Sequence, residues 1–439
     1  MSASSSDSDL LWPAPTASAP LRATVDVPGS KSLTNRYLAL AAIADGPGRV
    51  TEALRSRDSE LMIAALAQLG ITTTDTRDDV AIADWEVTPG QIVGGGRIDC
   101  GLAGTVMRFL PPIAALAAGP VFFDGDDGAR LRPMGKLLDA LVELGASVEY
   151  HGEAGFLPFT ITGPGTIAGG ELVIDSSETS QYVSALLMAA PLFKNGLDLR
   201  HNGEHLPSIP HITMTVAVLR EAGVQIDEYD LDTPNPRWVV HPGPIQARTW
   251  RVEPDLSNAG PFLAAAVVAG GEVSVPGWPT HTTQPGALLP GILEQIGAEY
   301  TLADDVLTVR GTGTIRGLDL DLSAAGELAP TITAILALAD TPSQLRGIGH
   351  LRGHETDRLA ALRAEINGLG GLVVETDDGL IIEPKPLHGG VFHTYADHRM
   401  ATAASIIGLQ IPGIQVENIR TTAKTMPNFV ELWNKMLSL

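Results

Sequence analysis

The segment PGSKSLTNR at positions 28–36 places two cations at the start of a predicted helix. Leu33 and Tyr37 follow at helical spacing and predict the buried face of that helix. Unpaired N–H groups give a helix N-terminus partial positive charge, so Lys31 and Arg36 stand at its unfavourable end. A bound anion would supply the missing negative charge. The segment is therefore a candidate anion site, with an ordinary solvated helix start as the alternative.

Several other segments begin with polar residues, continue with a helical apolar pattern and, in most cases, carry a cation near the start. One arginine near a helix start is ordinary. Because a cation recurs near the start of several such segments, we predict a single polyanion site assembled from many segments, most of them helix starts. These segments are GLAGTVMRFL (101–110), TSQYVSALLMAAP (179–191), HETDRLAALRAEI (354–366), YADHRMATAASII (395–407) and TAKTMPNFVELW (422–433).

The charge balance narrows the choice of ligand. The 439 residues include 29 Lys and Arg against 51 Asp and Glu, a formal net charge of −22. Such a chain is a poor binder of nucleic acid or anionic membranes, which favours small phosphate or carboxylate ligands. The single cysteine, Cys100, excludes an intramolecular disulfide and a multi-cysteine zinc site, as expected for a cytoplasmic protein.

The length suggests two to three domains, and no apolar run is long enough to predict a membrane span. Residues 1–20 lack both a basic start and an apolar core, so we expect a disordered tail there rather than a signal peptide.

An internal repeat organises the rest of the chain. A helix-like segment runs into a glycine five times, every 73–78 residues, at Gly70, Gly145, Gly223, Gly297 and Gly370. Glycine commonly closes a helix, so the near-constant period indicates a repeated supersecondary unit. The length accommodates about six such βα-type units. We expect the sixth unit to be shared by the two termini, which would make one domain discontinuous.

The motifs taken together resemble one family. They are PGSKSLTNR, LAGTVMRF, RPM (132–134), SQYVSALLMAAP, HETDRL, DHRM and AKT (423–425), and they span residues 28 to 425. This combination resembles the enolpyruvyl transferases called 5-enolpyruvylshikimate-3-phosphate synthases (3-phosphoshikimate 1-carboxyvinyltransferases). The resemblance implies an α/β fold of two similar domains, each built from three βαβαββ units as an inverted α/β barrel, with the active site in the cleft between them. It places a discontinuous domain at residues 21–29 plus 252–439 and an inserted domain at residues 30–251.

The resemblance also implies a reaction. The enolpyruvyl group of phosphoenolpyruvate would be transferred to the 5-hydroxyl of shikimate 3-phosphate by addition and elimination, with release of phosphate. This step belongs to the shikimate pathway, which leads to chorismate and the aromatic amino acids. The expected protein is a cytoplasmic monomer without cofactor or metal, and the eleven histidines show no HExxH-type spacing. Glyphosate is the family's known occupant of the phosphoenolpyruvate site.

The resemblance carries over onto individual residues. Shikimate 3-phosphate would be bound by Lys31, Ser32, Arg36, Thr179, Ser180, Gln181, Ser208, Glu327 and His354. Phosphoenolpyruvate would be bound by Lys31, Gly104, Arg132, Gln181, Arg358, Arg399 and Lys424. The expected catalytic residues are Glu327, Lys31, Glu355 and His354. Arginine forks suit phosphate and carboxylate, while hydroxyl and amide groups suit a polyhydroxylated ring.

The acid–base roles stay partly open. Glu327 is the favoured base for the ring hydroxyl, with Glu355 as the alternative. Glu355 and Lys31 are candidates for handling the proton at C3 of phosphoenolpyruvate. Without the resemblance, Glu327 in SAAGELAP would be interpreted as an ordinary turn carboxylate. The commoner family pattern has Asp where Glu327 stands and Lys where His354 stands.

Two rival functions remain. The sister enzyme transfers enolpyruvate to UDP-N-acetylglucosamine, but it uses a mobile-loop cysteine and lacks the PGSKS start. Cys100 lies just before a glycine-rich turn and fits a buried small hydrophobe better. The other rival is a non-catalytic phosphometabolite-binding protein. It would be favoured if some of the expected lysine and arginine residues were missing. The set here is complete apart from histidine at position 354.

Overall fold

Six small sheets carry the fold in the computed structural model, which describes residues 11–438. Five of the sheets are four-stranded and share one pattern. In each, one edge strand runs parallel to its neighbour, and the remaining pairings are antiparallel. In three of these sheets the chain runs from one parallel strand through a helix to the other and then into a second helix, which gives the predicted βαβαββ unit.

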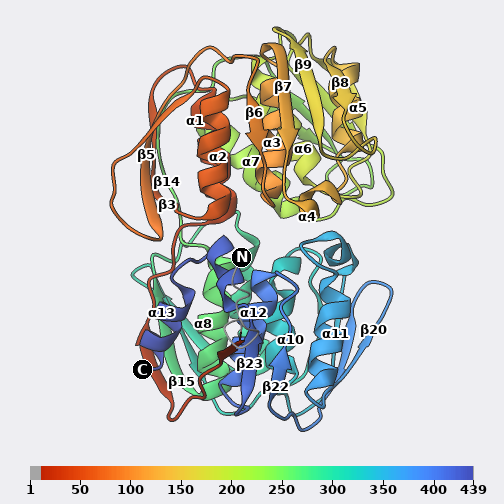
Figure 1. The fold of residues 1–439 in the computed structure, drawn as a ribbon. Helices are drawn as coiled ribbons and strands as arrows, with labels where there is room; N and C mark the ends of the chain where they lie inside the picture. Colours follow the sequence, from red (N-terminus) through yellow and green to blue (C-terminus); the bar gives the residue numbers. More distant parts are fainter. Residues whose placement is uncertain (1–10, 439) are drawn as a thin grey trace, which may run out of the picture. The chain divides into compact units, whose positions relative to one another are not determined.

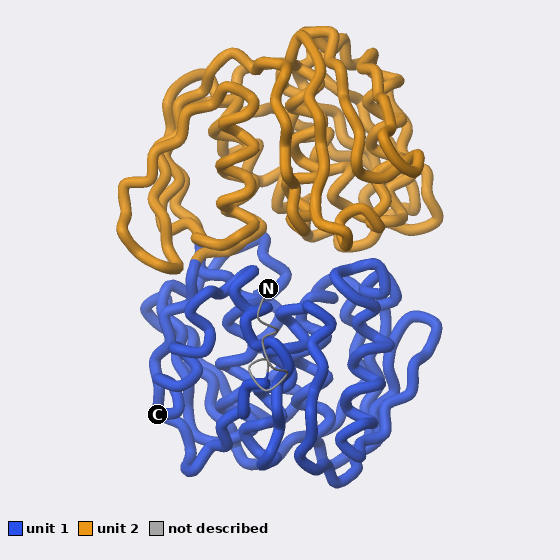
Figure 2. Tube along the Cα trace, in the orientation of Figure 1, with its two compact units in different colours: residues 1–28, 253–439 blue, residues 29–252 orange. Residues whose placement is uncertain are grey.

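The described residues form two compact units, drawn in different colours in Figure 2. Residues 29–252 make up one unit, which we call the inserted unit. Residues up to 28, together with 253 onwards, make up the other, which we call the discontinuous unit. Each unit contains three of the six sheets.

The inserted unit contains the sheets β14-β3-β5-β4, β6-β7-β9-β8 and β10-β11-β13-β12 (Figure 1). Its strands are β3 (Gly48–Leu54), β4 (Thr72–Asp75), β5 (Ile82–Thr88), β6 (Arg97–Asp99), β7 (Ala118–Asp124), β8 (Ser147–Tyr150), β9 (Phe159–Pro164), β10 (Gly170–Ile174), β11 (Leu197–His201), β12 (Ile226–Tyr229), β13 (Arg237–Val240) and β14 (Thr249–Arg251). Its helices are α1 (Lys31–Ala42), α2 (Arg57–Gln68), α3 (Gly104–Ala114), α4 (Asp127–Arg130), α5 (Gly135–Glu143), α6 (Gln181–Ala189) and α7 (Ile209–Glu221).

The discontinuous unit contains the sheets β16-β17-β15-β2, β18-β19-β21-β20 and β1-β23-β22. Its strands are β1 (Leu11–Pro13), β2 (Leu21–Thr24), β15 (Gly271–Pro276), β16 (Glu299–Ala303), β17 (Val306–Gly311), β18 (Asp319–Asp321), β19 (Ser343–Arg346), β20 (Leu372–Glu375), β21 (Leu380–Glu383), β22 (Gly390–Phe392) and β23 (Ile414–Glu417). Its α-helices are α8 (Leu256–Ala269), α9 (Leu289–Ile296), α10 (Ala329–Leu336), α11 (Arg358–Gly368), α12 (His398–Gly408) and α13 (Phe429–Met436).

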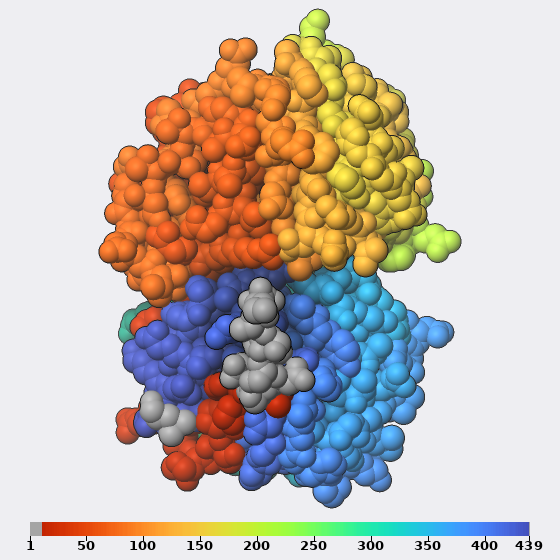
Figure 3. All heavy atoms as spheres, in the orientation of Figure 1, coloured from red at the N-terminus to blue at the C-terminus, as the bar shows by residue number. Residues whose placement is uncertain are grey.

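The N-terminal strands complete the discontinuous unit. β2 precedes α1 in the sequence, yet it pairs in parallel with β15, the strand that follows α8. β14 precedes α8, yet it pairs in parallel with β3, the strand that follows α1. β1 pairs antiparallel with β23 and completes the sixth sheet, so the sixth repeat is shared by the two ends of the chain as predicted. Figure 3 shows the red N-terminal segment lying beside blue C-terminal residues.

This pairing corrects the prediction of a disordered tail for residues 11–20. Besides the strand pairing of β1, the Ala14 N–H donates to the Ile414 carbonyl and the Ala17 N–H to the Leu409 carbonyl. Ala14 and Leu21 are buried, so long-range pairing outweighs the polar composition that predicted disorder. The rest of the predicted tail, residues 1–10, lies outside the described residues.

The five periodic glycines close helices as predicted. Each has a positive φ, between 80° and 119°, which a residue without a side chain adopts most easily. In this conformation the chain leaves the second helix of each of these units and enters the strand that follows.

Each unit buries the first helix of every repeat. α1, α3 and α6 lie in the core of the inserted unit, and α8, α10 and α12 lie in the core of the discontinuous unit. α8 contacts both α10 and α12, while α3 contacts α1 and α6. A helix that is apolar on nearly every side is stable only when other elements surround it. Among the described helices, none is long and apolar enough to cross a membrane.

Candidate active site

Arg36 ties three helices of the inserted unit together. Its Nε donates to Thr215 Oγ1 of α7 at 2.8 Å, and its Nη2 donates to the His211 carbonyl at 3.0 Å. The guanidinium also lies over the Phe109 ring of α3, 5.1 Å from the centroid. Ser30 caps the helix that carries Arg36, accepting from the Leu33 N–H. The predicted anion site at the start of α1 is therefore built into the packing of α1 against α3 and α7.

The charge of Arg36 has no carboxylate partner within residues 11–438. Its hydrogen-bond acceptors are two hydroxyl groups and two backbone carbonyls, all neutral. Arg36 is only 2% exposed, and burial lowers its pKa to about 9. It is still a cation at neutral pH, so the inserted unit buries a positive charge that an anion would stabilise.

Gly104 lies against two further arginines. A Cβ added there would lie 2.9 Å from Arg132 Nη2 and 3.1 Å from Arg108 Nη1. Arg108 is 3% exposed, and its Nε and Nη1 have no hydrogen-bond partner among the described residues, nor has Arg132 Nε. Burial, with a smaller contribution from the charge of Arg132, lowers the pKa of Arg108 to about 9. Two adjacent cations with unused donors form a second candidate anion site.

Arg108 was predicted only as the cation of the segment GLAGTVMRFL (101–110) and was not assigned to a substrate. The signal was in the sequence, because Arg108 follows Gly104 by four residues and therefore shares its helix face. Arg132 was predicted, and its Nη1 donates to the Leu102 carbonyl at 3.3 Å.

The predicted polar residues 179–181 open α6. Ser180 is buried, and Gln181 Oε1 has no hydrogen-bond partner among the described residues. The next residue, Tyr182, donates its hydroxyl to the Pro133 carbonyl at 2.6 Å, which joins the start of α6 to the segment that carries Arg132. Ser208 immediately precedes α7 and has a φ of 52°, a strained conformation that is often found at functional sites.

Lys31 is the first residue of α1, and Ser32 follows it. Lys31 Nζ lies 3.7 Å from Asp58 Oδ2, a buried carboxylate at the start of α2. Asp58 was missed by the sequence analysis, since its pairing with Lys31 joins two helices that only the fold brings together.

The discontinuous unit holds its cations in an ion-pair network. Arg358 donates to both oxygens of Asp397, from Nε at 2.8 Å and from Nη2 at 3.2 Å. Arg358 Nη2 also donates to Glu355 Oε2 at 2.9 Å, and Lys424 Nζ donates to Glu355 Oε1 at 2.6 Å. Burial opposes the charge of Arg358, but Asp397 and Glu355 outweigh it and raise its pKa above the ordinary value. His354 Nδ1 lies 3.3 Å from Arg358 Nη1, so two other predicted residues, Glu355 and His354, contact this arginine.

α11 begins at Arg358, capped by Asp357, so this cation stands at the helix start as predicted. One local prediction in this unit was wrong in detail. Lys424 ends a 3₁₀ helix (Ile419–Lys424), whereas it was predicted near the start of an α-helix. Pro427 follows closely and disfavours the helical conformation in the residue before it, so α13 begins only at Phe429.

Glu327 lies in a 3₁₀ turn (Gly326–Leu328) directly before α10. Its Oε1 accepts a hydrogen bond from Ser257 Oγ at 3.3 Å. Arg399 Nη1 donates to the Ser257 carbonyl at 3.1 Å, so the starts of α8, α10 and α12 meet at Ser257. Burial raises the pKa of Glu327 above the ordinary carboxyl value, and the charge of Arg399 partly opposes this. Ser257 was also missed, although it stands at the same place in its repeat as Ser32.

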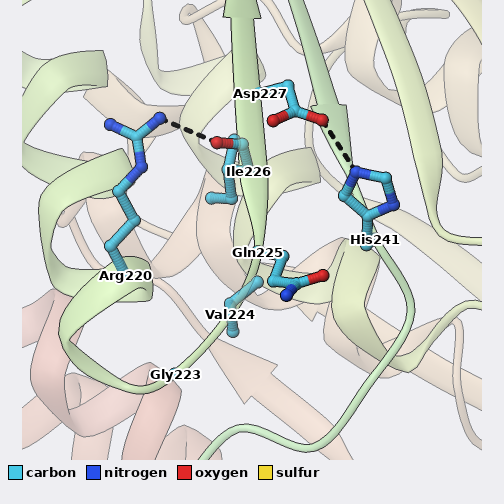
Figure 4. A pocket seen from close by; sticks show the side chains of 7 residues that line it. All are labelled: Arg220, Gly223, Val224, Gln225, Ile226, Asp227 and His241. Carbon is cyan, nitrogen blue, oxygen red and sulfur yellow. Dashed lines mark hydrogen bonds and ion pairs between the residues drawn. The ribbon is translucent and has the colours of Figure 1, made fainter.

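Two open surface pockets contain none of the predicted site residues. One is lined by Arg220, Gly223, Val224, Gln225, Ile226, Asp227 and His241. Figure 4 shows Arg220 donating to the Ile226 carbonyl and His241 paired with Asp227. The other is formed by Arg55 and residues 75–80. Within residues 11–438, no group of three or more His, Cys, Asp or Glu side chains is placed to hold a metal ion.

Repeated βαβαββ units whose helix starts carry buried arginines define an α/β protein with candidate sites for small phosphorylated or carboxylated molecules. The chain belongs to the EPSP synthase (3-phosphoshikimate 1-carboxyvinyltransferase) family, whose model matches residues 15–433. A 3-phosphoshikimate 1-carboxyvinyltransferase of Kocuria rhizophila is 56% identical over 436 residues, which cover 98% of this chain and 97% of that protein.

Solved structures show the same fold. Two structures of EPSP synthase from Acinetobacter baumannii superpose with TM-scores of 0.79 and 0.77, at 24% and 23% identity. In both cases the match covers 96% of this chain and 97% of the other.

Proposed function

We propose that this protein transfers the enolpyruvyl group of phosphoenolpyruvate to the 5-hydroxyl of shikimate 3-phosphate and releases phosphate. Family membership supports the reaction. The observation in the structure that carries the proposal is the pair Arg108 and Arg132 against Gly104, two cations with unused donors and no carboxylate partner in the described chain. Phosphoenolpyruvate, with a phosphate and a carboxylate, would satisfy such donors.

We assign the substrates to residues of both units. In the inserted unit, Lys31, Ser32, Arg36, residues 179–181 and Ser208 bind shikimate 3-phosphate. In the discontinuous unit, we assign Glu327 and His354 to its ring hydroxyls. Phosphoenolpyruvate is bound by Lys31, Gly104, Arg132, Gln181, Arg358, Arg399 and Lys424. The buried neutral partners of Arg36 support this assignment, because they leave its charge for a ligand.

The proposed chemistry needs a base, an acid and an anion site for the departing phosphate. Glu327 takes the proton of the ring hydroxyl. The hydroxyl oxygen attacks C2 of phosphoenolpyruvate, and C3 of phosphoenolpyruvate gains a proton. The tetrahedral intermediate then loses phosphate, and C3 loses a proton to restore the double bond. Glu355 or Lys31 handles the C3 proton, and no metal takes part.

Two observations favour Glu327 over Glu355 as the hydroxyl base. A carboxylate with a raised pKa holds a proton more readily at neutral pH, which suits a base. Both oxygens of Glu355 are already bound to cations, Lys424 and Arg358, and an engaged oxygen is a poorer proton acceptor.

The sister reaction with UDP-N-acetylglucosamine is disfavoured by Cys100. The thiol is fully buried, and burial raises its pKa well above the ordinary value, so it carries little thiolate. A cysteine in this state cannot replace the reactive loop cysteine of that enzyme.

A coupled assay tests the proposal. Purified protein should release phosphate only when shikimate 3-phosphate and phosphoenolpyruvate are both present, equally well with and without a chelator. Phosphate release with UDP-N-acetylglucosamine as acceptor would show that the sister reaction is the true one. No turnover with either acceptor would favour a binding protein.

We further propose that the enzyme acts in the cytoplasm as a monomer. Its family role in amino-acid biosynthesis and its single buried cysteine support the compartment. Light scattering at working concentration tests the monomeric state, and cell fractionation tests the compartment.

A further inference from the structure

The turn that leads into α12 has a strained backbone. Tyr395 and Ala396 are consecutive non-glycine residues with φ of 53° and 57°, in the left-handed region that favours glycine. The turn ends at Asp397, the N-cap of α12. Such a conformation persists only where the surrounding structure holds it in place.

A buried carboxylate, Glu365, holds this turn together with Glu417, whose Oε2 accepts from the Thr394 N–H at 3.4 Å. Glu365 lies about two turns into α11 and is 6% exposed. Its Oε1 accepts from the Tyr395 hydroxyl at 2.6 Å, and its Oε2 accepts from the His393 N–H at 2.8 Å. Burial, together with Glu365, raises the pKa of Tyr395 to about 12, so the hydroxyl stays a donor. Both hydrogen bonds end on Glu365, so one side chain holds the turn at two points.

The same turn contacts two of the arginines that are proposed to bind anions, Arg358 and Arg399. Asp397 is fully buried and joins Arg358 through two hydrogen bonds. It also accepts from the Arg399 N–H at 2.8 Å and so fixes the first turn of α12. α11 and the segment 393–399 are thus cross-linked at two points, at Arg358 and at Glu365.

We propose that Glu365 is a positioning residue for Arg358 and Arg399, because it holds the strained turn 393–397 from which Asp397 reaches both of them. Its consequence for turnover rests on the proposed function, in which the two arginines bind phosphoenolpyruvate. Glu365 itself touches no substrate. Its loss should therefore weaken the use of phosphoenolpyruvate more than that of shikimate 3-phosphate.

Steady-state kinetics of two variants test this. In Glu365→Ala, KM for phosphoenolpyruvate should rise about tenfold, and KM for shikimate 3-phosphate should change less than about twofold. In Glu365→Gln, the amide oxygen takes over the hydrogen bond from the His393 N–H, and Nε2 donates to the Tyr395 oxygen. That variant should stay within about threefold of the wild type for both substrates.

Asn367→Ala is the matched control on the same helix. Asn367 ties α11 to β20 through Val373, donating to its carbonyl at 3.0 Å and accepting from its N–H at 2.6 Å. Its loss should lower stability without changing KM for phosphoenolpyruvate. An equal rise of that KM in the control would show that Glu365 acts only through stability.

Relief of the strain should rescue the defect. Glycine adopts a positive φ without steric cost, so Ala396→Gly added to Glu365→Ala should recover part of the lost affinity for phosphoenolpyruvate. Ala396→Gly alone should resemble the wild type. A Glu365→Ala enzyme with wild-type KM values would overturn the inference.

Crystal structures of the variants separate this inference from the proposed function. Glu365→Ala should show a displaced turn and a changed Asp397–Arg358 pair, whether or not the protein turns over any substrate. An unchanged turn in that structure rejects the positioning role. If Glu365→Ala fails to fold, Tyr395→Phe, which removes one of the two hydrogen bonds, should show a smaller shift of the same kind. An inactive wild type would reject the proposed function alone.

Discussion

At the scale of single residues, the environment of Glu327 decides what its carboxylate can do. Ser257 donates to one oxygen, and the nearby charge of Arg399 partly offsets the burial that raises its pKa. An isolated glutamate is a weaker base, because its pKa lies far below neutral pH. Burial at the start of α10 thus turns an ordinary turn carboxylate into a candidate base, and Ser257 and Arg399 limit how far its pKa rises.

Replacing Glu327 by Gln keeps the shape and removes the proton acceptor. We expect turnover to fall by about 100-fold or more, with shikimate 3-phosphate binding largely retained in calorimetry. In the wild type, kcat/KM should fall as the pH drops through the raised pKa of Glu327, because protonation removes the base. Near-normal turnover of the variant would transfer the role to Glu355 or His354.

The cations assigned to the substrates should matter far more than exposed ones. Lys31→Met and Arg399→Ala should each cost at least about 2 kcal/mol in kcat/KM, or roughly 30-fold, because a bound anion loses a direct partner. Arg22→Ala is the control, since Arg22 is almost fully exposed on β2. Equal losses in all three variants would point to general destabilisation.

At the scale of elements, the helix starts serve both stability and function. Asp397 caps α12 and also neutralises Arg358, so one carboxylate fixes the starts of two helices. The first helix of each repeat is buried along its length, whereas its N-terminus carries polar and charged groups. This arrangement gathers residues that are remote in the sequence at the ends of neighbouring helices.

Asp397→Ala should destabilise the discontinuous unit strongly. It leaves the buried guanidinium of Arg358 with fewer partners and removes a helix cap, so we expect a loss of about 3–5 kcal/mol in the free energy of unfolding. Urea denaturation measures this. Asp319→Ala breaks an exposed pair with Arg346 on the same unit and should leave the midpoint almost unchanged. Similar midpoints for the two variants would refute the structural role of the buried pair.

At the scale of the whole molecule, the two units differ in how the chain builds them. The inserted unit is continuous in sequence and has its own hydrophobic core. The discontinuous unit has a separate core, and two of its three sheets need strands from residues 11–24.

Fragments of the chain test this difference. Residues 29–252 expressed alone should unfold cooperatively on heating, as followed by circular dichroism, and should bind shikimate 3-phosphate weakly. Residues 253–439 alone lack β1 and β2, so they should not give a cooperative transition. A cooperative transition in that second fragment would mean that the N-terminal strands are dispensable for the fold.

Local signals predicted much of this architecture. The periodic glycines indicated the repeat, and their positive φ values follow from the need to end a helix before a strand. The polar helix starts identified the segments around Lys31, Gly104, Arg358 and Arg399, because capping and amphipathic patterns are local properties of the chain. The start of α13 was misplaced because a proline two residues before it had a stronger local effect than the helical pattern.

The sequence by itself therefore determined the repeat, the helix starts, the family and the types of residue available for chemistry. Only the tertiary structure decided which of them meet. It paired Lys31 with Asp58, placed Ser257 beside Glu327, set Arg108 against Arg132 and joined β1 to β23. These contacts depend on long-range packing, since each links segments separated by tens to hundreds of residues, and no local pattern records the partner of a buried charge or an edge strand.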